Sequence, residues 1–239
     1  MAPQLHRVGR IGSTMDHLHQ LAEQGAPAGT AILAEAQTGG RGSRGRAWHS
    51  PPGGLWLSVL YRPASPAGAE LLSLRLGLRA AEALDTAAPG LPVMLKWPND
   101  LIVSDRKLGG ILCEARWQGE SLAWIAAGVG LNVTNPIPDE LRLTATALGE
   151  HLPGATVEAI LPGLLDALRR PLADAERLTP DEERQLERRD WLRGRRLRAP
   201  LGGRAEGIAA DGALLIRTDD GLRAVRTGHV ELADGSSPR

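Results

Sequence analysis

Short apolar segments separated by tight turns occupy the middle of the chain, and this spacing restricts the fold more than any other feature. Apolar runs of strand length occupy residues 93–97, 101–103, 107–114 and 122–133. The turns Ser104-Asp105-Arg106 and Trp117-Gln118-Gly119-Glu120 are too short to hold a crossover helix. Parallel neighbours need a connection of about a dozen residues. These segments therefore predict antiparallel hairpins.

Helical periodicity flanks these hairpins. Apolar residues recur at helical spacing within residues 70–84, and Ser13 with Asp16 resembles a capping box at the start of an earlier helix. Further helices are predicted over residues 157–178 and 180–192. Hairpins covered by helices predict an α+β fold with a mixed, mainly antiparallel sheet, rather than a doubly wound α/β fold.

The pattern changes from about residue 193. Short apolar runs there alternate with the turn signals Asp211-Gly212, Asp219-Asp220-Gly221 and Thr227-Gly228, which are typical of closely spaced hairpins. This pattern predicts a small SH3-like β-barrel. We therefore predict a first domain over residues 1–192 and a small β-domain over residues 193–239.

Composition argues against several classes of protein. The formal net charge is zero, which disfavours a general attraction to nucleic acid or to an anionic membrane. The single cysteine, Cys113, excludes an internal disulfide and a zinc site with several cysteines. No apolar run reaches the roughly 18 residues of a membrane span, and the first residues lack the apolar core of a signal peptide. A cytoplasmic location is expected.

Residues 37–48, Gln-Thr-Gly-Gly-Arg-Gly-Ser-Arg-Gly-Arg-Ala-Trp, are the most distinctive stretch. Glycine lets the backbone adopt positive φ and approach a ligand closely, and arginine offers a planar fork of donors that suits phosphate and carboxylate. Such a loop is suited to close over an anion. These residues alone leave two alternatives open: a flexible basic surface loop and a nucleic-acid contact.

Lysine is rare in this chain. Only Lys96 and Lys107 are lysines among the 28 basic residues. Where arginine is so strongly preferred, a lysine indicates a position at which arginine would not serve. Both lysines lie within 12 positions of each other, so this region is predicted to carry chemistry.

Four segments now stand in one order: Gly12-Ser13-Thr14, residues 37–48, residues 96–112 and residues 128–132. In this order and spacing they resemble the biotin protein ligases (biotin–[acetyl-CoA-carboxylase] ligases). The resemblance extends from about Val8 to the end of the chain. It implies a catalytic domain like that of class II aminoacyl-tRNA synthetases and biotin ligases, followed by the small β-domain.

The resemblance implies a two-step reaction with ATP and biotin as substrates and Mg²⁺ as cofactor. The carboxylate of biotin attacks the α-phosphate of ATP and gives biotinyl-5′-AMP and pyrophosphate. A lysine of a biotin carboxyl carrier protein, the carrier of acetyl-CoA carboxylase, then attacks the mixed anhydride. No covalent enzyme intermediate forms, in agreement with the lack of a Gly-x-Ser-x-Gly motif and with the position of Cys113 in an apolar strand.

The resemblance also suggests the site residues. Lys107 matches the catalytic lysine, whose compact ammonium can reach the carboxylate and the α-phosphate, and Arg41 matches a second catalytic group. Contacts with biotin or its adenylate are expected from Ser13, Thr14, Met15, Gln37, Gly40, Arg41, Gly42, Ser43, Lys107 and Gly110.

Nucleotide contacts are expected from Arg44, Arg46, Trp48, Asn99 and Asn132. Trp48 is open to two interpretations, stacking on adenine or shielding the loop, and the two asparagines either bind nucleotide or fix loop backbones. Asp100 could reach Mg²⁺ directly or through water, but one carboxylate does not define a metal site. The metal ligands are therefore left unassigned.

The chain departs from the family pattern at two points. Ser43 stands where the family often has a third arginine, so a side-chain contact with phosphate is lost and weaker retention of biotinyl-AMP is expected. Only a short arm precedes Ser13, whereas some members carry an N-terminal helix-turn-helix domain. Neither nucleic acid nor membrane is expected as a partner, and a homodimer is left open.

Two other readings are weighed against a biotin ligase. A lipoate or octanoyl transferase of related fold is disfavoured by the complete Gly/Arg loop. A non-catalytic sensor of biotin or biotinyl-AMP is disfavoured because Lys107 and Arg41 are both present.

Overall fold

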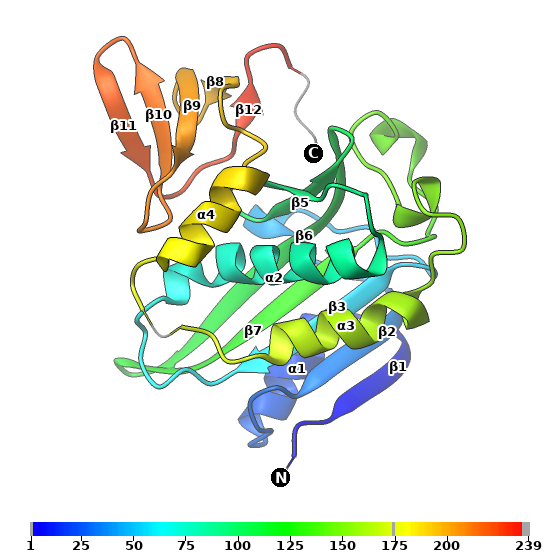
Figure 1. Ribbon diagram of the computed structural model, residues 1–239. Coiled ribbons are helices and arrows are strands. Elements are labelled where there is room, and N and C mark those ends of the chain that lie inside the picture. Colours follow the sequence, from blue (N-terminus) through cyan, green and yellow to red (C-terminus); the bar gives the residue numbers. More distant parts are fainter. Residues whose placement is uncertain (1, 174, 236–239) are drawn as a thin grey trace.

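The computed structural model describes residues 2–173 and 175–235 and contains a seven-stranded sheet at its centre (Figure 1). The strands stand in the order β1 (Leu5–Ile11), β2 (Ala31–Gln37), β3 (Leu55–Tyr61), β7 (Ser121–Leu131), β6 (Arg106–Gln118), β5 (Asp100–Val103) and β4 (Met94–Lys96). Only the β1–β2 pair is parallel among these neighbours. The predicted mixed, mainly antiparallel sheet is confirmed.

Helices cover both faces of this sheet. Helices α2 (Leu72–Ala87) and α3 (Val157–Arg169) pack together on one face, α1 (Thr14–Glu23) lies on the other, and α4 (Pro180–Arg189) lies beside α2 (Figure 1). Single 3₁₀ turns are formed by Ser43–Gly45, Ala69–Leu71, Asp139–Leu141 and Leu148–Glu150. The predicted α+β class is therefore confirmed.

Alternation of side chains along the strands gives the sheet two separate cores. In β2, Ala31 and Leu33 pack with the helices α2 and α3, while Ile32 packs with Met15 and Leu18 of α1. Successive strand residues point to opposite faces, so β2, β3 and β7 supply buried residues to both cores. The core on the α1 side is the smaller of the two, and it stops where the site begins.

A second sheet follows α4. Its antiparallel strands stand in the order β11 (Gly221–Val225), β10 (Leu214–Thr218), β9 (Gly203–Ile208), β8 (Arg196–Ala199) and β12 (Glu231–Leu232) (Figure 1). The predicted run of hairpins in this region is confirmed as an antiparallel sheet.

The helix predicted over residues 157–178 is too long. It ends at Arg169, because Arg170 has extended backbone (φ −57°, ψ 142°) and precedes Pro171, a position that disfavours the helical conformation. The segment that follows is held by the buried guanidinium of Arg75, which donates to the carbonyls of Ala173, Ala175 and Arg177 at 2.8, 3.0 and 2.9 Å.

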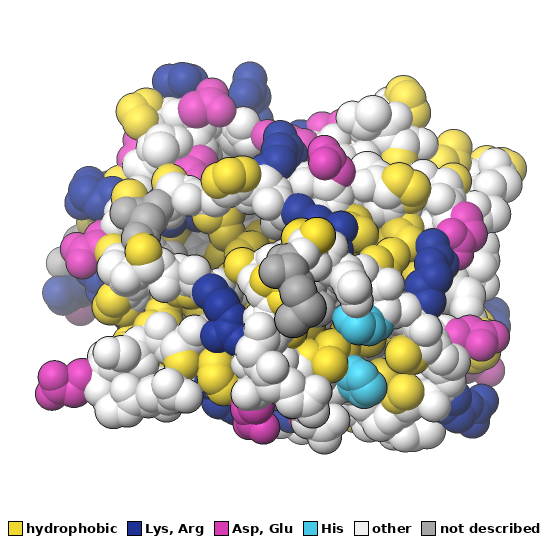
Figure 2. Space-filling model, turned by 90° about the horizontal axis from the view of Figure 1, so that it is seen from below, with side chains coloured by type: hydrophobic (Ala, Val, Ile, Leu, Met, Phe, Trp, Pro, Cys, Tyr) yellow, Lys and Arg dark blue, Asp and Glu magenta, His cyan; other side chains and the backbone are white. Residues whose placement is uncertain are grey.

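Charged side chains of both signs are scattered around the face shown in Figure 2, and apolar side chains lie in its recesses. This face carries no large patch of a single sign, as expected for a chain without net charge. Within residues 2–173 and 175–235, no helix is long and apolar enough to cross a membrane.

Candidate active site

The site lies on the α1 face of the large sheet, where glycines replace side chains. Trp124 and Ala126 of β7 pack against α1, but the next residues that share their face are Gly128 and Gly130. Gly110 lies opposite Gly130 in the neighbouring strand β6. The missing side chains leave a cavity of about 410 Å³ beside α1.

The Gly/Arg loop folds over this cavity as a small hairpin. The Trp48 N–H donates to the carbonyl of Gly40 at 2.9 Å, and the Gly42 N–H donates to that of Arg46 at 2.8 Å. Arg44 and Gly45 form the tip with positive φ, 61° and 71°. A Cβ at Gly40 would lie 2.4 Å from the carbonyl oxygen of Trp48, so this position requires glycine.

A network of uncharged polar groups forms one end of the cavity. Gln37 Oε1 accepts from the Thr14 N–H at 2.8 Å and from Thr14 Oγ1 at 3.0 Å, while Gln37 Nε2 donates to Ser50 Oγ at 2.9 Å. Ser58 Oγ donates to Thr14 Oγ1 at 2.8 Å. Ser13 precedes α1 and caps it, because Ser13 Oγ accepts from the Met15 N–H at 3.2 Å. These groups are fixed donors and acceptors that suit a neutral polar ligand group.

Lys107 points into the cavity because of a β-bulge. Leu101 pairs with Gly109 but Ile102 pairs with Lys107, so Leu108 is an extra residue in β6. The bulge places Lys107 on the same face as Gly110, three residues away; in a regular strand the two would face opposite sides. A Cβ at Gly110 would lie 3.5 Å from Lys107 Cε.

The ammonium of Lys107 is held between a carboxylate and an indole ring. Lys107 Nζ lies 2.7 Å from Asp100 Oδ1 and 5.1 Å from the centre of the Trp48 ring. Its backbone N–H and carbonyl are bonded to Thr144 and Thr146. The side chain is only 10% exposed, so its charge acts in a site with little screening by water.

Trp48 covers Gly130 and brings a free donor into the site. Its Nε1 is buried and has no hydrogen-bond partner within the part of the chain that the structure describes. A buried donor without an acceptor costs about 1–3 kcal/mol. An acceptor on a ligand would remove this cost.

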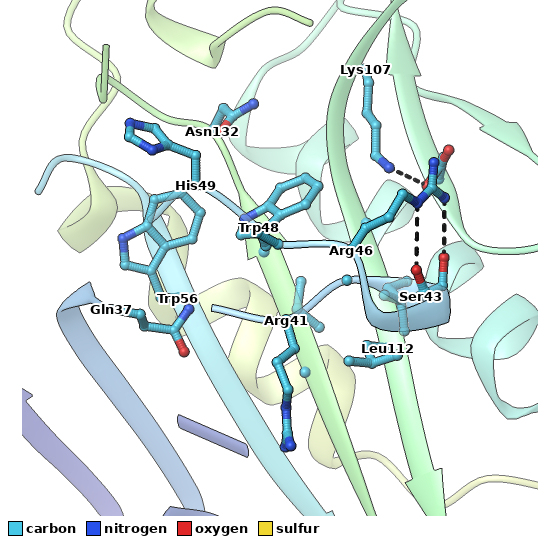
Figure 3. Close-up of a pocket in the computed structure, with 18 of the residues that line it drawn as sticks. Gln37, Arg41, Ser43, Arg46, Trp48, His49, Trp56, Lys107, Leu112 and Asn132 are labelled. Atoms are coloured by element: carbon cyan, nitrogen blue, oxygen red, sulfur yellow. Dashed lines mark hydrogen bonds and ion pairs between the residues drawn. The ribbon is translucent and has the colours of Figure 1, made fainter. Parts of the chain in front are cut away.

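Two arginines of the loop, Arg41 and Arg46, point in different directions (Figure 3). Arg46 donates to the backbone oxygen and to Oγ of Ser43, at 3.4 and 3.3 Å. Arg41 extends away from Lys107 (Figure 3) and its Nη2 lies 2.9 Å from Asp16 Oδ1 and 3.2 Å from Glu114 Oε2. Arg44 and Gly40 do not line the cavity, unlike the other residues expected to bind biotin or nucleotide.

Both asparagines use their amide groups to hold backbone. Asn99 Nδ2 donates to the Ile111 carbonyl at 2.6 Å, and Asn132 Nδ2 donates to the Thr146 carbonyl at 3.1 Å. Asn132 Oδ1 accepts from Asn135 at 3.1 Å. Both still line the cavity. The amide of Asn99 thus holds strand β6 and that of Asn132 holds the segment after β7, while nucleotide binding by either side chain stays a prediction.

The sequence did not indicate two parts of the wall. One is Trp56 of β3, which looked like an ordinary apolar strand residue, and the other is the segment that contributes Asn135, Ile137, Pro138, Leu141 and Ala145. Trp56 faces the cavity because it lies two residues before Ser58, on the same face of β3, and opposite Gly130 of β7. The pairing of β3 with β7 is known only from the structure, so the sequence alone could not reveal this position.

Burial changes the acid–base properties of two nearby groups. It lowers the pKa of Lys96 to about 8, against a smaller opposing effect of Asp100. It raises the pKa of the Cys113 thiol to about 12, so this cysteine stays protonated and is not a nucleophile at neutral pH. No cluster of three or more His, Cys, Asp or Glu side chains suited to a metal occurs in residues 2–173 and 175–235.

The hairpin that carries Lys107 is attached to the C-terminal part of the chain. Its turn, Ser104-Asp105, has positive φ at both residues, 49° and 59°. Asp105 Oδ1 accepts from Trp191 Nε1 at 2.7 Å and from Arg195 Nη2 at 2.6 Å. The residues just before β8 therefore brace the turn between β5 and β6.

Comparison with known proteins gives the family. Residues 8–132 match the model of the biotin/lipoate A/B protein ligase family. The chain belongs to this family. Residues 193–233 match a second model, the biotin protein ligase C-terminal domain.

Individual relatives agree with the family over most of the chain. The bifunctional ligase/repressor BirA of Bacillus subtilis is 32% identical over 237 residues, covering 93% of this chain and 72% of that protein. The biotin–[acetyl-CoA-carboxylase] ligase of Mycobacterium tuberculosis is 35% identical over 224 residues, covering 87% and 79%. The structure of the biotin protein ligase from Aquifex aeolicus in complex with biotin and ATP matches with a TM-score of 0.80 and 27% identity, over 96% of this chain and 99% of that one.

Proposed function

We propose that this family member is a biotin–[acetyl-CoA-carboxylase] ligase, which forms biotinyl-5′-AMP from biotin and ATP and transfers the biotinyl group to a lysine of a carrier protein. The observation that carries this proposal is the layout of the cavity. An uncharged polar network surrounds Gln37, and the buried ammonium of Lys107 lies apart from it, on the other side of Trp48 (Figure 3). Relatives named as biotin ligases and the biotin- and ATP-bound Aquifex structure support it.

In the first step, a carboxylate oxygen of biotin bonds to the α-phosphorus of ATP, and the bond to pyrophosphate breaks. Thr14 and Gln37 offer the fixed donors and acceptors for the ureido ring, and the apolar wall holds the rest of the molecule. Lys107 would lie between the two reacting anions, offset their repulsion and stabilise charge on the phosphate oxygens. Arg41 and Gly42 would hold the adenylate.

In the second step, the carrier lysine attacks the acyl carbon, and AMP leaves with the bonding electron pair. This chain needs no nucleophile of its own, in agreement with the protonated thiol of Cys113. Mg²⁺ would enter as its complex with ATP. Asp100 is the carboxylate nearest to Lys107, and it would meet that complex directly or through water.

We further propose two domains, a carrier and a location for this protein. Residues 1–192 form the catalytic domain, with the fold of class II synthetases, and residues 193–239 form an SH3-like domain; residues 236–239 lie outside the described structure. The carrier belongs to acetyl-CoA carboxylase, the location is cytoplasmic, nucleic acid is not a partner, and a homodimer stays a prediction.

The test is a transfer assay. The purified chain is incubated with MgATP, a carrier domain, and either biotin or lipoate, and the carrier is analysed by streptavidin blot and by mass. We expect a mass increase with biotin only. A carrier modified by lipoate alone would select a lipoate ligase, and binding of biotin without transfer would select a sensor.

A further inference from the structure

A chain of contacts runs from the interior of the protein to Arg41. Trp124 Nε1 donates to His19 Nδ1 at 2.9 Å. Indole N–H groups only donate, so Nδ1 of His19 is the acceptor and the ring proton of the neutral tautomer sits on Nε2. That nitrogen lies 3.1 Å from Glu114 Oε2. His19 is a buried residue of α1, on the face that packs against the sheet. Because its ring is held by Trp124, it fixes the position of the Glu114 carboxylate.

The same carboxylate oxygen holds Arg41. Glu114 Oε2 lies 3.2 Å from Arg41 Nη2, and Asp16 Oδ1 lies 2.9 Å from the same nitrogen. A guanidinium has five N–H donors spread over three nitrogens. Both contacts use Nη2, so they leave Nε and Nη1 available to a further acceptor.

The contact of Arg41 with Glu114 differs from an ordinary surface ion pair. Exposed pairs are worth little, because two mobile side chains must be ordered to form them. Glu114 is already ordered by His19 and its side chain is 23% exposed, whereas Asp16 is 58% exposed. The entropy that a free arginine would lose on binding a phosphate is thus partly lost before the ligand arrives.

We propose that Asp16, His19 and Glu114 are positioning residues that hold Arg41 by Nη2 and keep its Nε and Nη1 donors available to biotinyl-AMP. We call these three residues the Arg41 support. The proposal rests on the proposed function. None of the three needs to touch the substrate; they act through Arg41 alone.

The first test compares ligands in Glu114→Gln, which keeps the shape of the side chain but removes its charge. We expect the affinity for a non-hydrolysable biotinyl-AMP analogue to fall about tenfold and the affinity for biotin alone to change less than twofold, both by calorimetry. Asp16→Asn should act in the same direction with a smaller loss. The control is Glu158→Gln, which removes a 2.7 Å ion pair with Arg7 away from the cavity and should change neither affinity.

A double-mutant cycle decides whether Glu114 acts through Arg41. In an Arg41→Ala background, Glu114→Gln should have no further effect on binding of the analogue. A second tenfold loss in that background would overturn the proposal. The wild-type chain is measured first, because failure to bind the analogue and to form biotinyl-AMP would reject the proposed function itself rather than the Arg41 support.

Variants of His19 separate positioning from packing. His19→Gln keeps an N–H that can reach Glu114, whereas His19→Leu fills space without a donor. We expect about a threefold loss of affinity for the analogue in the leucine variant and recovery in the glutamine variant. Equal losses in both, or a loss that only follows the fall in melting temperature, would contradict the role of His19.

Discussion

Gly130 is the position where one added methyl group should disturb the chemistry more than the fold. A Cβ there would lie 2.6 Å from Trp48 Nε1 and 2.8 Å from Trp48 Cε2. Carbon atoms pack best at about 3.5–4.0 Å, so the indole of Trp48 must withdraw by about 1 Å in Gly130→Ala. This shift moves the ring that faces Lys107 Nζ at 5.1 Å and changes the roof of the cavity.

The two consequences have different expected sizes. Trp48 belongs to a loop and can yield, so the unfolding free energy should fall by only about 1–2 kcal/mol, the lower part of the range for overpacking. A displacement of about 1 Å at a reacting centre can cost about 10²-fold in rate. We therefore expect the rate of biotinyl-AMP formation to fall by about 10- to 100-fold. The rate is measured by the pyrophosphate released.

The control is Gly9→Ala in β1, where an added Cβ meets no heavy atom within 4 Å. It should leave the rate unchanged and shift the unfolding free energy by less than about 0.5 kcal/mol. A folded Gly130→Ala protein with the wild-type rate would refute the reasoning, since it would mean that the position of Trp48 does not matter for adenylate formation.

Three further changes test the site. Lys107→Ala should slow biotinyl-AMP formation about 10²–10³-fold and lower the unfolding free energy by only about 1–3 kcal/mol through the loss of the Asp100 contact; a rate near wild type in pyrophosphate release would remove the catalytic assignment. Ser43→Arg should slow the escape of biotinyl-AMP in a chase experiment, and unchanged escape would count against a role of this position in retention. Burial lowers the pKa of Lys96 from 10.5 to about 8. Between pH 8 and 10.5 the unfolded chain therefore binds more protons at Lys96 than the folded chain does. The free energy of unfolding should rise with pH across this window by up to about 3 kcal/mol. Lys96→Met should lack this rise in urea unfolding at pH 7.5 and 10, whereas equal pH dependence in both proteins would exclude Lys96 as its source.

Local patterns predicted the elements but not how they meet. The turns at residues 104–106 and 117–120 were sufficient to predict the β5–β6 and β6–β7 hairpins, because a short turn permits only antiparallel pairing. The helix after residue 157 was predicted too long, since apolar periodicity did not register the effect of Pro171 on the residue before it. The division into domains at residue 193 stays a prediction.

For the site, residue types could be predicted from the sequence, but the contacts between them could not. Lys107 and Gln37 could be selected from residue type and order, yet the bulge that turns Lys107 into the cavity depends on its pairing with Ile102. The partners of Arg41 could not be foreseen either, since Glu114 lies 73 positions away in sequence. Trp56 was missed because nothing in a run of apolar strand residues marks the one that faces a glycine.

The contacts of Asp105 with Trp191 and Arg195 make the position of one cavity residue, Lys107, depend on residues outside the cavity. The turn they hold sets the register of the hairpin, and a slip of one residue would move Lys107 to the opposite face of the sheet. Chains shortened to end before Trp191 would thus lose the contacts that hold the hairpin of Lys107 while keeping every residue that lines the cavity. Trp191 and Arg195 therefore hold the hairpin that carries Lys107 although neither of them lines the cavity.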